Sequence, residues 1–196
     1  MPRRQDCEKL LKQKARVIWL TGLSGSGKST LANALSAELL SRGFITCLLD
    51  GDIIRNNVNK DLGFSMVDRS ENIRRTAEIT KIMIDSGLIV ITSFLSPTKA
   101  IREMAKHIIG EDDFIEIFID CPLETCRNRD VKGLYLQAEQ GILSNFTGID
   151  SVYEPPLNPF LAINTVSMDI TESTYLLLNS VLPRITYKPK TCDEAL

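Results

Sequence analysis

The sequence predicts an α/β fold, a three-layer α/β/α sandwich built around a five-stranded parallel sheet. Five short apolar runs are spaced along the 196 residues, and longer stretches of helical character separate them. The runs are continuously apolar rather than alternating, which is typical of strands buried on both faces of a parallel sheet. Strand–helix alternation of this kind requires right-handed crossovers, and these place helices on both faces of the sheet.

Each expected element follows from a local signal. The strands are the apolar runs themselves, Val17–Thr21, Thr46–Leu49, Leu88–Thr92, Phe114–Ile119 and Leu161–Asn164. The helices lie between and after them, at Ser29–Arg42, Asp68–Asp85, Pro97–Ile109 and Thr171–Leu182. Gly43 and Gly87 follow the first two helices, and glycine commonly ends a helix. Pro97 suits the first turn of the third helix, and Pro183 follows the fourth.

Residues 127–159 interrupt this alternation. The segment holds three glycines and three prolines, and only Tyr135–Gln140 carries a weak helical signal. An irregular segment of this length inside a compact domain is usually functional or disordered. We therefore expect one domain over residues 1–196, in which residues 127–159 form a lid and substrate-loop segment.

Composition and charge narrow the class of protein. The net charge of −2 and an aromatic fraction of 6% argue against a nucleic-acid-binding surface. The first apolar run, Val17–Leu20, is too short for a signal peptide or a membrane span. Scattered cysteines predict reduced thiols rather than a metal cluster or a disulfide framework; they are Cys7, Cys47, Cys121, Cys126 and Cys192. We expect a cytoplasmic protein without nucleic-acid or membrane partners.

A glycine-rich loop joins the first expected strand to the first expected helix. Residues 22–29 read Gly-Leu-Ser-Gly-Ser-Gly-Lys-Ser and fit the phosphate-loop pattern G-x-x-x-x-G-K-[ST]. The glycines let backbone N–H groups point at phosphate oxygens, and the helix N-terminus adds the positive end of its dipole. Lys28 can reach the β- and γ-phosphates, and the Ser29 hydroxyl can ligate Mg²⁺. The flanking strand and helix disfavour a turn that binds nothing.

Other sequence features restrict the classes of phosphate-loop protein. A GTPase needs an Asn/Thr-Lys-x-Asp motif, and the nearest string, residues 59–62, has its acid one position early. A transporter ATPase or a helicase would need a longer chain and further motifs. A kinase with a small acceptor therefore remains.

Two acids end the second expected strand. Asp50 and Asp52 would face the ligand crevice, which lies at the carboxyl ends of parallel strands. One acid would organise Mg²⁺ and the other would orient the attacking hydroxyl; the alternative is a solvated Asp-Gly turn. The single histidine, His107, lies late in a helix away from these strand ends, so a carboxylate is the candidate proton acceptor.

Basic residues follow the acids. Arg55 lies one helical turn beyond Asp52, and Arg69 and Asn72 repeat that spacing. Clustered guanidinium groups suit an anionic acceptor, because they match sulfate and phosphate geometry. Arg74 and Arg75 are equally explained by a solvated helix face.

The lid segment supplies further cations and an aromatic ring. Arg127, Arg129 and Lys132 open the segment, and a mobile lid that brings cations over phosphates is a common kinase device. Phe64 and Phe146 lie in loops in which an aromatic ring could stack on a base; the alternative for each is a plug in the core.

Motif strings recur along the chain in a fixed order. They are GLSGSGKST (22–30), LDGD with Arg55 (49–55), NKDLGF (59–64), DRSENIRR (68–75), GLIVITSFLSP (87–97), RDVKGLY (129–135), NFTGIDSVYEPP (145–156) and NP (158–159). NFTGID with YEPP is far more specific than the phosphate loop. Together the strings resemble the adenylylsulfate kinase family, which phosphorylates the 3′-hydroxyl of adenosine 5′-phosphosulfate with ATP.

The resemblance implies a P-loop kinase fold, ATP and Mg²⁺ as cofactors, and adenosine 5′-phosphosulfate as the acceptor in sulfate assimilation. ATP would be bound by Gly22, Leu23, Ser24, Gly25, Ser26, Gly27, Lys28, Ser29, Thr30 and Arg129. The acceptor would be bound by Asp50, Asp52, Arg55, Phe64, Arg69, Asn72, Lys132 and Phe146. The metal ion would be ligated by Ser29 and Asp50.

The resemblance also implies catalytic residues, namely Asp52, Lys28 and Ser96. Ser96 matches a position often assigned a phosphoserine intermediate. Direct in-line transfer needs no enzyme nucleophile, so Ser96 can instead cap the helix expected from Pro97. Thr98, Lys99 and Glu139 depart from the residues usual in the family.

Two other functions stay open from the sequence. One is a kinase of the same fold that acts on another small anionic alcohol. The other is a non-catalytic nucleotide-binding partner, against which the intact Lys28, Ser29 and Asp52 argue. A homodimer and a sulfurylase partner also stay open.

Overall fold

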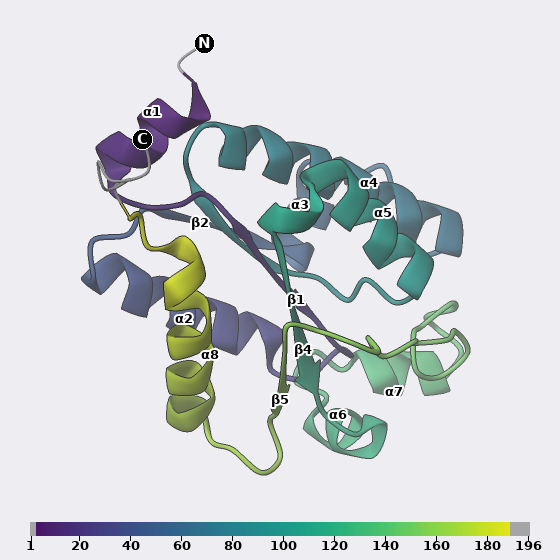
Figure 1. Ribbon diagram of the computed structural model, residues 1–196. Helices are drawn as coiled ribbons and strands as arrows, with labels where there is room; N and C mark the ends of the chain where they lie inside the picture. Colours follow the sequence, from purple (N-terminus) through teal and green to yellow (C-terminus); the bar gives the residue numbers. More distant parts are fainter. Residues whose placement is uncertain (1–2, 189–196) are drawn as a thin grey trace, which may run out of the picture.

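The computed structural model describes residues 3–188 and centres on a five-stranded, fully parallel sheet (Figure 1). The strand order is β2-β3-β1-β4-β5, which confirms the predicted fold class. The strands are β1 (Val17–Thr21), β2 (Thr46–Asp50), β3 (Ile89–Ser93), β4 (Phe114–Asp120) and β5 (Leu161–Asn164). The first and last have the predicted bounds, β2 and β4 are one residue longer at the carboxyl end, and β3 is shifted by one residue at both ends.

Helices cover both faces of the sheet (Figure 1). The helices α2 (Lys28–Ser41) and α8 (Ile170–Ile185) pack on one face, and α4 (Met66–Asp85) and α5 (Lys99–Ile109) pack on the other. Strand β1 is buried on both of its faces, which explains its apolar sequence. Ile18 and Leu20 belong to the core with α2 and α8, whereas Val17 and Trp19 belong to the core with α4 and α5.

The structure adds short helices that the sequence analysis missed. They are α1 (Arg4–Leu11), α3 (Gly51–Asn56), the 3₁₀ helix η1 (Glu111–Asp113) and α6 (Leu123–Arg129). The weak signal in the lid segment is confirmed as α7 (Leu134–Glu139). Pro183 lies inside α8 rather than beyond it. A proline so near the end of a helix removes a single backbone hydrogen bond, so the last turn is kept.

The start of α5 also differs from the expectation. The helix begins at Lys99 rather than Pro97, and Thr98 is its N-cap, with the Thr98 hydroxyl accepting a hydrogen bond from the Ile101 N–H. The interpretation of Ser96 as the cap of this helix is therefore wrong. Thr98 has extended dihedral angles, φ −115° and ψ 156°, so the helix begins only after it and excludes Pro97.

The amino ends of the strands and the end of α8 meet at one edge of the molecule. The Lys14 N–H donates to the Ile185 carbonyl at 2.7 Å, and Gln13 and Thr186 form an isolated antiparallel bridge. Helix α1 is attached to the same edge by ion pairs, because Asp113 accepts from both Arg4 and Arg16. This edge lies opposite the carboxyl ends of the strands.

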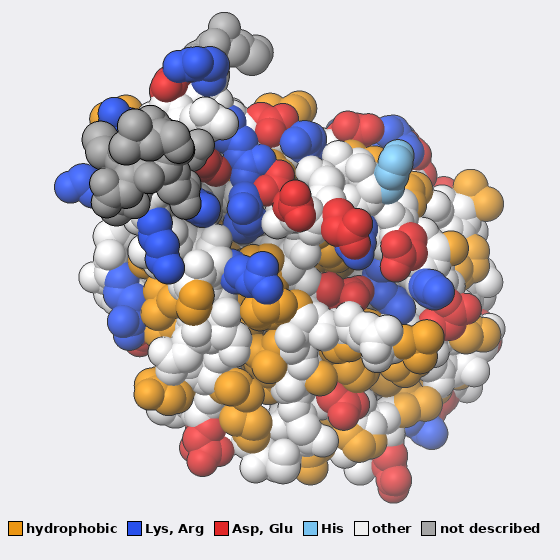
Figure 2. All heavy atoms as spheres, viewed as in Figure 1, with side chains coloured by type: hydrophobic (Ala, Val, Ile, Leu, Met, Phe, Trp, Pro, Cys, Tyr) orange, Lys and Arg blue, Asp and Glu red, His pale blue; other side chains and the backbone are white. Residues whose placement is uncertain are grey.

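The surface in Figure 2 carries mixed charge. Acidic and basic side chains lie beside one another over the upper right of this face, and hydrophobic side chains gather lower down. Within residues 3–188, none of the helices is both long enough and apolar enough to span a bilayer. Cys7, Cys47, Cys121 and Cys126 are free thiols, and Cys192 lies outside the described residues.

Candidate active site

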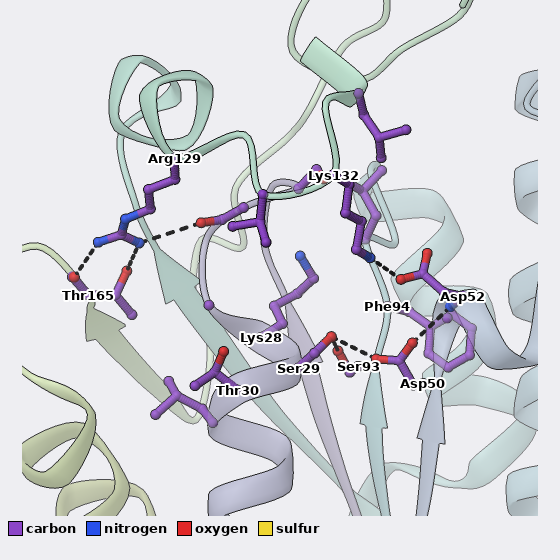
Figure 3. A pocket seen from close by; sticks show the side chains of 18 of the residues that line it. Lys28, Ser29, Thr30, Asp50, Asp52, Ser93, Phe94, Arg129, Lys132 and Thr165 are labelled. Atoms are coloured by element: carbon purple, nitrogen blue, oxygen red, sulfur yellow. Dashed lines mark hydrogen bonds and ion pairs between the residues drawn. The ribbon is translucent and has the colours of Figure 1, made fainter. Parts of the chain in front are cut away.

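A cavity of about 810 Å³ opens at the carboxyl ends of β1, β2 and β3 (Figure 3). Strand register explains why these ends supply its floor. Asp50 lies opposite Ser93, and Ser93 lies opposite Leu20, one residue before β1 ends. Although β3 lies between β2 and β1, this register brings their carboxyl ends level, and Asp50 reaches Ser29 at the end of the phosphate loop.

Backbone geometry of the phosphate loop requires its glycines. Gly25 has φ 74° and Gly27 has φ 101°, in the left-handed region that glycine adopts without strain. A Cβ atom at Gly22 would lie 2.6 Å from the Ile119 carbonyl oxygen. A Cβ atom at Gly25 would lie 2.9 Å from the carbonyl oxygen of Cys126 in α6. The loop is therefore packed tightly against β4 and α6.

Lys28 begins α2 and lies over the phosphate loop (Figure 3). Its ammonium donates to the Leu23 carbonyl at 2.5 Å. The pKa of Lys28 is lowered to about 8. The main cause is burial, because a charged ammonium is poorly solvated here, and the nearby charge of Lys132 contributes. An anionic phosphate would replace the lost solvation, so the position is electrostatically prepared for an anion.

Ser29 and Asp50 lie together at the floor of the cavity. The Ser29 hydroxyl donates to Asp50 Oδ2 at 2.7 Å and lies 3.1 Å from the Ser93 hydroxyl. The other carboxylate oxygen of Asp50 accepts from the Asp52 N–H at 2.9 Å and caps α3. The two acids therefore occupy different positions: Asp50 faces Ser29, and Asp52 lies in the first turn of α3.

Asp52 meets the lid segment. Its carboxylate forms an ion pair with Lys132, although the two residues are 80 positions apart (Figure 3). Both side chains are about half exposed, so water screens the pair. Lys132 of the lid segment therefore contacts Asp52, the predicted catalytic acid.

Aromatic and basic residues form the other half of the cavity. The Arg55 guanidinium lies 4.6 Å from the centre of the Phe64 ring, and that of Arg69 lies 5.6 Å from it. Arg69 also donates to the Asn145 carbonyl at 2.8 Å, which ties α4 to the loop that carries Phe146. Asn72 and Phe146 line the same half.

Arg55 and Arg69 differ from the arginines that follow them on α4. Within the described residues, neither forms an ion pair, and burial lowers the pKa of Arg69 to about 10 and also lowers that of Arg55. Arg74 and Arg75 instead form ion pairs with Glu71, and Arg75 also with Asp61. A half-buried and a buried cation that have no counter-ion among residues 3–188 are suited to bind an anionic ligand.

Arg129 borders the cavity on the side of β5. Its guanidinium donates to the Thr165 carbonyl at 2.8 Å and reaches the Thr165 hydroxyl at 3.3 Å (Figure 3). Thr165 in turn donates to the Ser26 carbonyl at 2.9 Å. Arg127 does not line the cavity and pairs with Glu139, one of the departures noted in the sequence.

Three predicted ATP-binding residues do not line the cavity. Gly22 lies against Ile119 of β4, Ser26 is fully buried, and Leu23 lines a separate hollow beside β4. The sequence analysis missed residues that do line it, including Phe94 at the end of β3 and Thr165, Met168 and Ile170 after β5. Their position after the last strand was a usable signal, because it is the rule that found Asp50.

Ser96 borders the cavity but is almost completely buried. It is 1% exposed and has φ 35°, and its hydroxyl donates to Thr21 Oγ1 at 2.8 Å while accepting from the Trp19 ring N–H at 3.2 Å. Its carbonyl accepts from Arg102 at 3.0 Å. Both sides of the hydroxyl are therefore engaged within the protein.

A family model described as adenylylsulphate kinase matches residues 14–164, which include every element of this cavity up to β5. The chain belongs to the adenylylsulphate kinase family. The adenylyl-sulfate kinase of Bacteroides thetaiotaomicron is 54% identical to the chain over 188 residues, which are 96% of this chain and 94% of that protein. Membership makes the chain an ATP-dependent kinase of adenylyl sulfate, as the resemblance of its motifs implied.

Solved structures agree with this family. The APS kinase CysC of Mycobacterium tuberculosis, in complex with AMPPNP and APS, is 40% identical and superposes with a TM-score of 0.82 over 86% of this chain and 98% of that chain. The hexameric APS kinase of Thiobacillus denitrificans is 29% identical, with a TM-score of 0.66, over 87% of this chain but only 29% of that chain.

Proposed function

We propose that this cavity transfers the γ-phosphate of ATP to the 3′-hydroxyl of adenosine 5′-phosphosulfate, with donor and acceptor bound in opposite halves. The proposal rests on two arginines that line the same cavity as Lys28. Arg55 and Arg69 form no ion pair within residues 3–188. Lys28 would stabilise the phosphates of ATP. Arg55 and Arg69 would hold the phosphosulfate, and the adenine of the acceptor would lie between Phe64 and Phe146.

The mechanism follows from these positions. Phosphoryl transfer has a loose transition state, so positioning and charge stabilisation contribute more than base strength. Asp52 would orient the acceptor hydroxyl and take up its proton, while Lys132 would leave its ion pair with Asp52 to face the transferring phosphate. Lys28 would bind the oxygens on which negative charge develops. Arg129, held by Thr165, would border the base of ATP.

The donor groups in the cavity fit Mg²⁺. Ser29 and Asp50 offer oxygen ligands, the kind that Mg²⁺ prefers, and their side chains lie 2.7 Å apart. No cluster of three or more metal-binding His, Cys, Asp or Glu side chains occurs within residues 3–188. This suits a cation that keeps waters and binds substrate phosphates instead of a full protein cage. When bound, Mg²⁺ would neutralise charge on the β- and γ-phosphates.

A substrate screen tests the proposal. The purified chain is supplied with ATP, Mg²⁺ and one candidate acceptor at a time, and the release of ADP is measured. We expect rapid release with adenosine 5′-phosphosulfate and little with adenosine 5′-phosphate or small sugar acids. Release with another anionic alcohol and not with adenosine 5′-phosphosulfate would favour the second kinase function. A homodimer, a sulfurylase partner and a cytoplasmic location stay predictions.

Arg55→Ala is expected to weaken acceptor binding far more than ATP binding. The loss of a charged contact in a closed site costs about 2–5 kcal/mol, which raises the KM for adenosine 5′-phosphosulfate by roughly 30-fold or more. Steady-state kinetics with each substrate varied in turn measures this. Arg74→Ala is the matched control, because Arg74 pairs with Glu71 outside the cavity. Equal weakening of both substrates would contradict the assignment of Arg55 to the acceptor half.

Ser96→Ala is expected to lower stability more than activity. The substitution leaves the buried ring N–H of Trp19 without a partner, which costs about 1–3 kcal/mol of unfolding free energy. Turnover should stay within about 10-fold of the parent, because the proposed transfer is direct. Thermal denaturation and single-turnover transfer measure the two effects. A folded variant without any transfer would support a phosphoserine route instead.

A further inference from the structure

We propose that Asn59 is a positioning residue, which holds the side-chain amide of Asn72 with its NH₂ group toward the acceptor nucleotide. The inference rests on the proposed function, because it assigns a role toward the same acceptor. Asn59 belongs to the NKDLGF string, in which Phe64 is the residue that lines the cavity. It is fully buried where the chain passes from α3 to α4.

The backbone of Asn59 is fixed on both sides. Its N–H donates to the Ile54 carbonyl at 2.9 Å, and its carbonyl accepts from the Leu62 N–H at 3.1 Å. The side chain extends toward α4. There its Nδ2 atom donates to Oδ1 of Asn72 at 2.7 Å and lies 3.4 Å from the backbone oxygen of Asn72.

These two contacts determine which way both amides point. A backbone carbonyl can only accept a hydrogen bond, so the end of Asn59 beside the Asn72 carbonyl must be its NH₂ group. That NH₂ group requires an oxygen opposite it, which assigns Oδ1 of Asn72 to this contact. If the Asn72 amide turned over, two NH₂ groups would face each other in a buried place.

The NH₂ group, a hydrogen-bond donor, is therefore the only side-chain group that Asn72 can offer to a ligand. Asn72 is 4% exposed and lines the cavity in the same half as Arg69. Its backbone carbonyl accepts from the Thr76 hydroxyl at 2.7 Å, so both of its oxygens are occupied. Within residues 3–188, its Nδ2 atom donates to no protein group. The geometry thus favours an oxygen of an anionic acceptor nucleotide and opposes a ligand that presents a donor there.

Asn59→Asp tests the inference with almost no change in shape. The introduced carboxylate would repel Oδ1 of Asn72 and turn the amide, so that its oxygen faces the acceptor. We expect the KM for adenosine 5′-phosphosulfate to rise about 10- to 100-fold, with the KM for ATP and the kcat at saturation within about 2-fold. Lowering the pH should restore part of the affinity, because a protonated carboxyl can donate to Asn72 again.

A double-mutant comparison separates positioning from a general structural role. Asn59→Ala should raise the KM for the acceptor in the parent but leave it unchanged in an Asn72→Ala background, because Asn59 acts only through Asn72. The same increase in both backgrounds would overturn the inference. Thr80→Val is the control for a disturbed core, since Thr80 is a buried α4 residue whose hydroxyl has no partner in the described chain.

The outcomes distinguish this inference from the proposed function. If the parent protein does not phosphorylate adenosine 5′-phosphosulfate, the proposed function fails. If the parent does so and both Asn59 variants keep its KM, the positioning role fails and the proposed function stands. Thermal denaturation accompanies each variant, and the Asn59→Ala comparison replaces Asn59→Asp if that variant is unfolded.

Discussion

Lys28→Ala is expected to abolish phosphoryl transfer while the protein stays folded. Lys28 is the one cation that the described phosphate loop offers to the donor phosphates, and its burial makes its charge effective. Loss of a preorganised donor to developing charge costs about 10²–10³-fold in turnover, and more where a full charge is removed. Single-turnover transfer measures the loss. Near-normal turnover of a folded variant would refute the assignment of this loop.

Lys28 is also expected to affect the free energy of unfolding. The folded chain holds the Lys28 pKa near 8, against an ordinary value of 10.5, so the unfolded chain binds this proton more tightly. Folding is therefore penalised at neutral pH, and the penalty fades as pH rises from about 8 to 10.5. Lys28→Met keeps the aliphatic stem and should stabilise the ligand-free protein at pH 7 by on the order of 1–3 kcal/mol. The difference from the parent should shrink at pH 10 in chemical denaturation.

Asp52→Asn is expected to separate catalysis from ATP binding. The substitution keeps the size of the side chain and removes its charge, so turnover should fall roughly 10²–10⁴-fold if Asp52 takes up the proton of the acceptor hydroxyl. ATP should still bind, because the phosphate loop does not use this carboxylate. Acceptor binding can even tighten, since one negative charge is removed from the half that binds an anion.

Two measurements made together decide the role of Asp52. Single-turnover transfer reports the chemical step, and calorimetry reports ATP affinity. An unchanged rate would make Asp52 a turn residue and transfer the role to Asp50. A joint loss of rate and ATP affinity would make Asp52 structural or a metal ligand, and would contradict the division of labour between the two acids. Asp61→Asn is the control, because Asp61 pairs with Arg75 away from the cavity.

Local patterns predicted the sheet well because its strands are buried on both faces. Val17–Thr21 is recognisable without any partner, since every one of its residues is apolar or β-branched and buried. The spacing of Asp52 and Arg55 indicated a helical turn, but the bounds of α3 could not be predicted in this way. The helix has only six residues, and it is held by the carboxylate of Asp50 rather than by an apolar stripe. Helix α1 was missed for a related reason, because distant Asp113 anchors it through Arg4.

The candidate site likewise has residues that local patterns predict and residues whose placement depends on distant contacts. The phosphate loop, Asp50 and Asp52 were predicted because their roles depend on short-range spacing and on the ends of strands. Lys132 was named, but its ion pair with Asp52 joins residues 80 positions apart and depends on how the lid segment folds back. Thr165 was missed because a single threonine carries no motif, although its position directly after β5 was a usable signal. The family resemblance supplied roles that spacing alone could not, and those roles stay predictions until the variants are measured.

The meeting of Lys14 and Ile185 at one edge of the sheet has a consequence for how this domain can be joined to others. Both chain segments leave from the side opposite the cavity, and they lie within hydrogen-bond distance of each other. A second domain fused before or after this one would thus leave the substrate entrance open, and an insertion into a host chain would need little linker. This geometry makes the unit portable. It suits the hexameric relative, in which the matched region is under a third of a longer polypeptide.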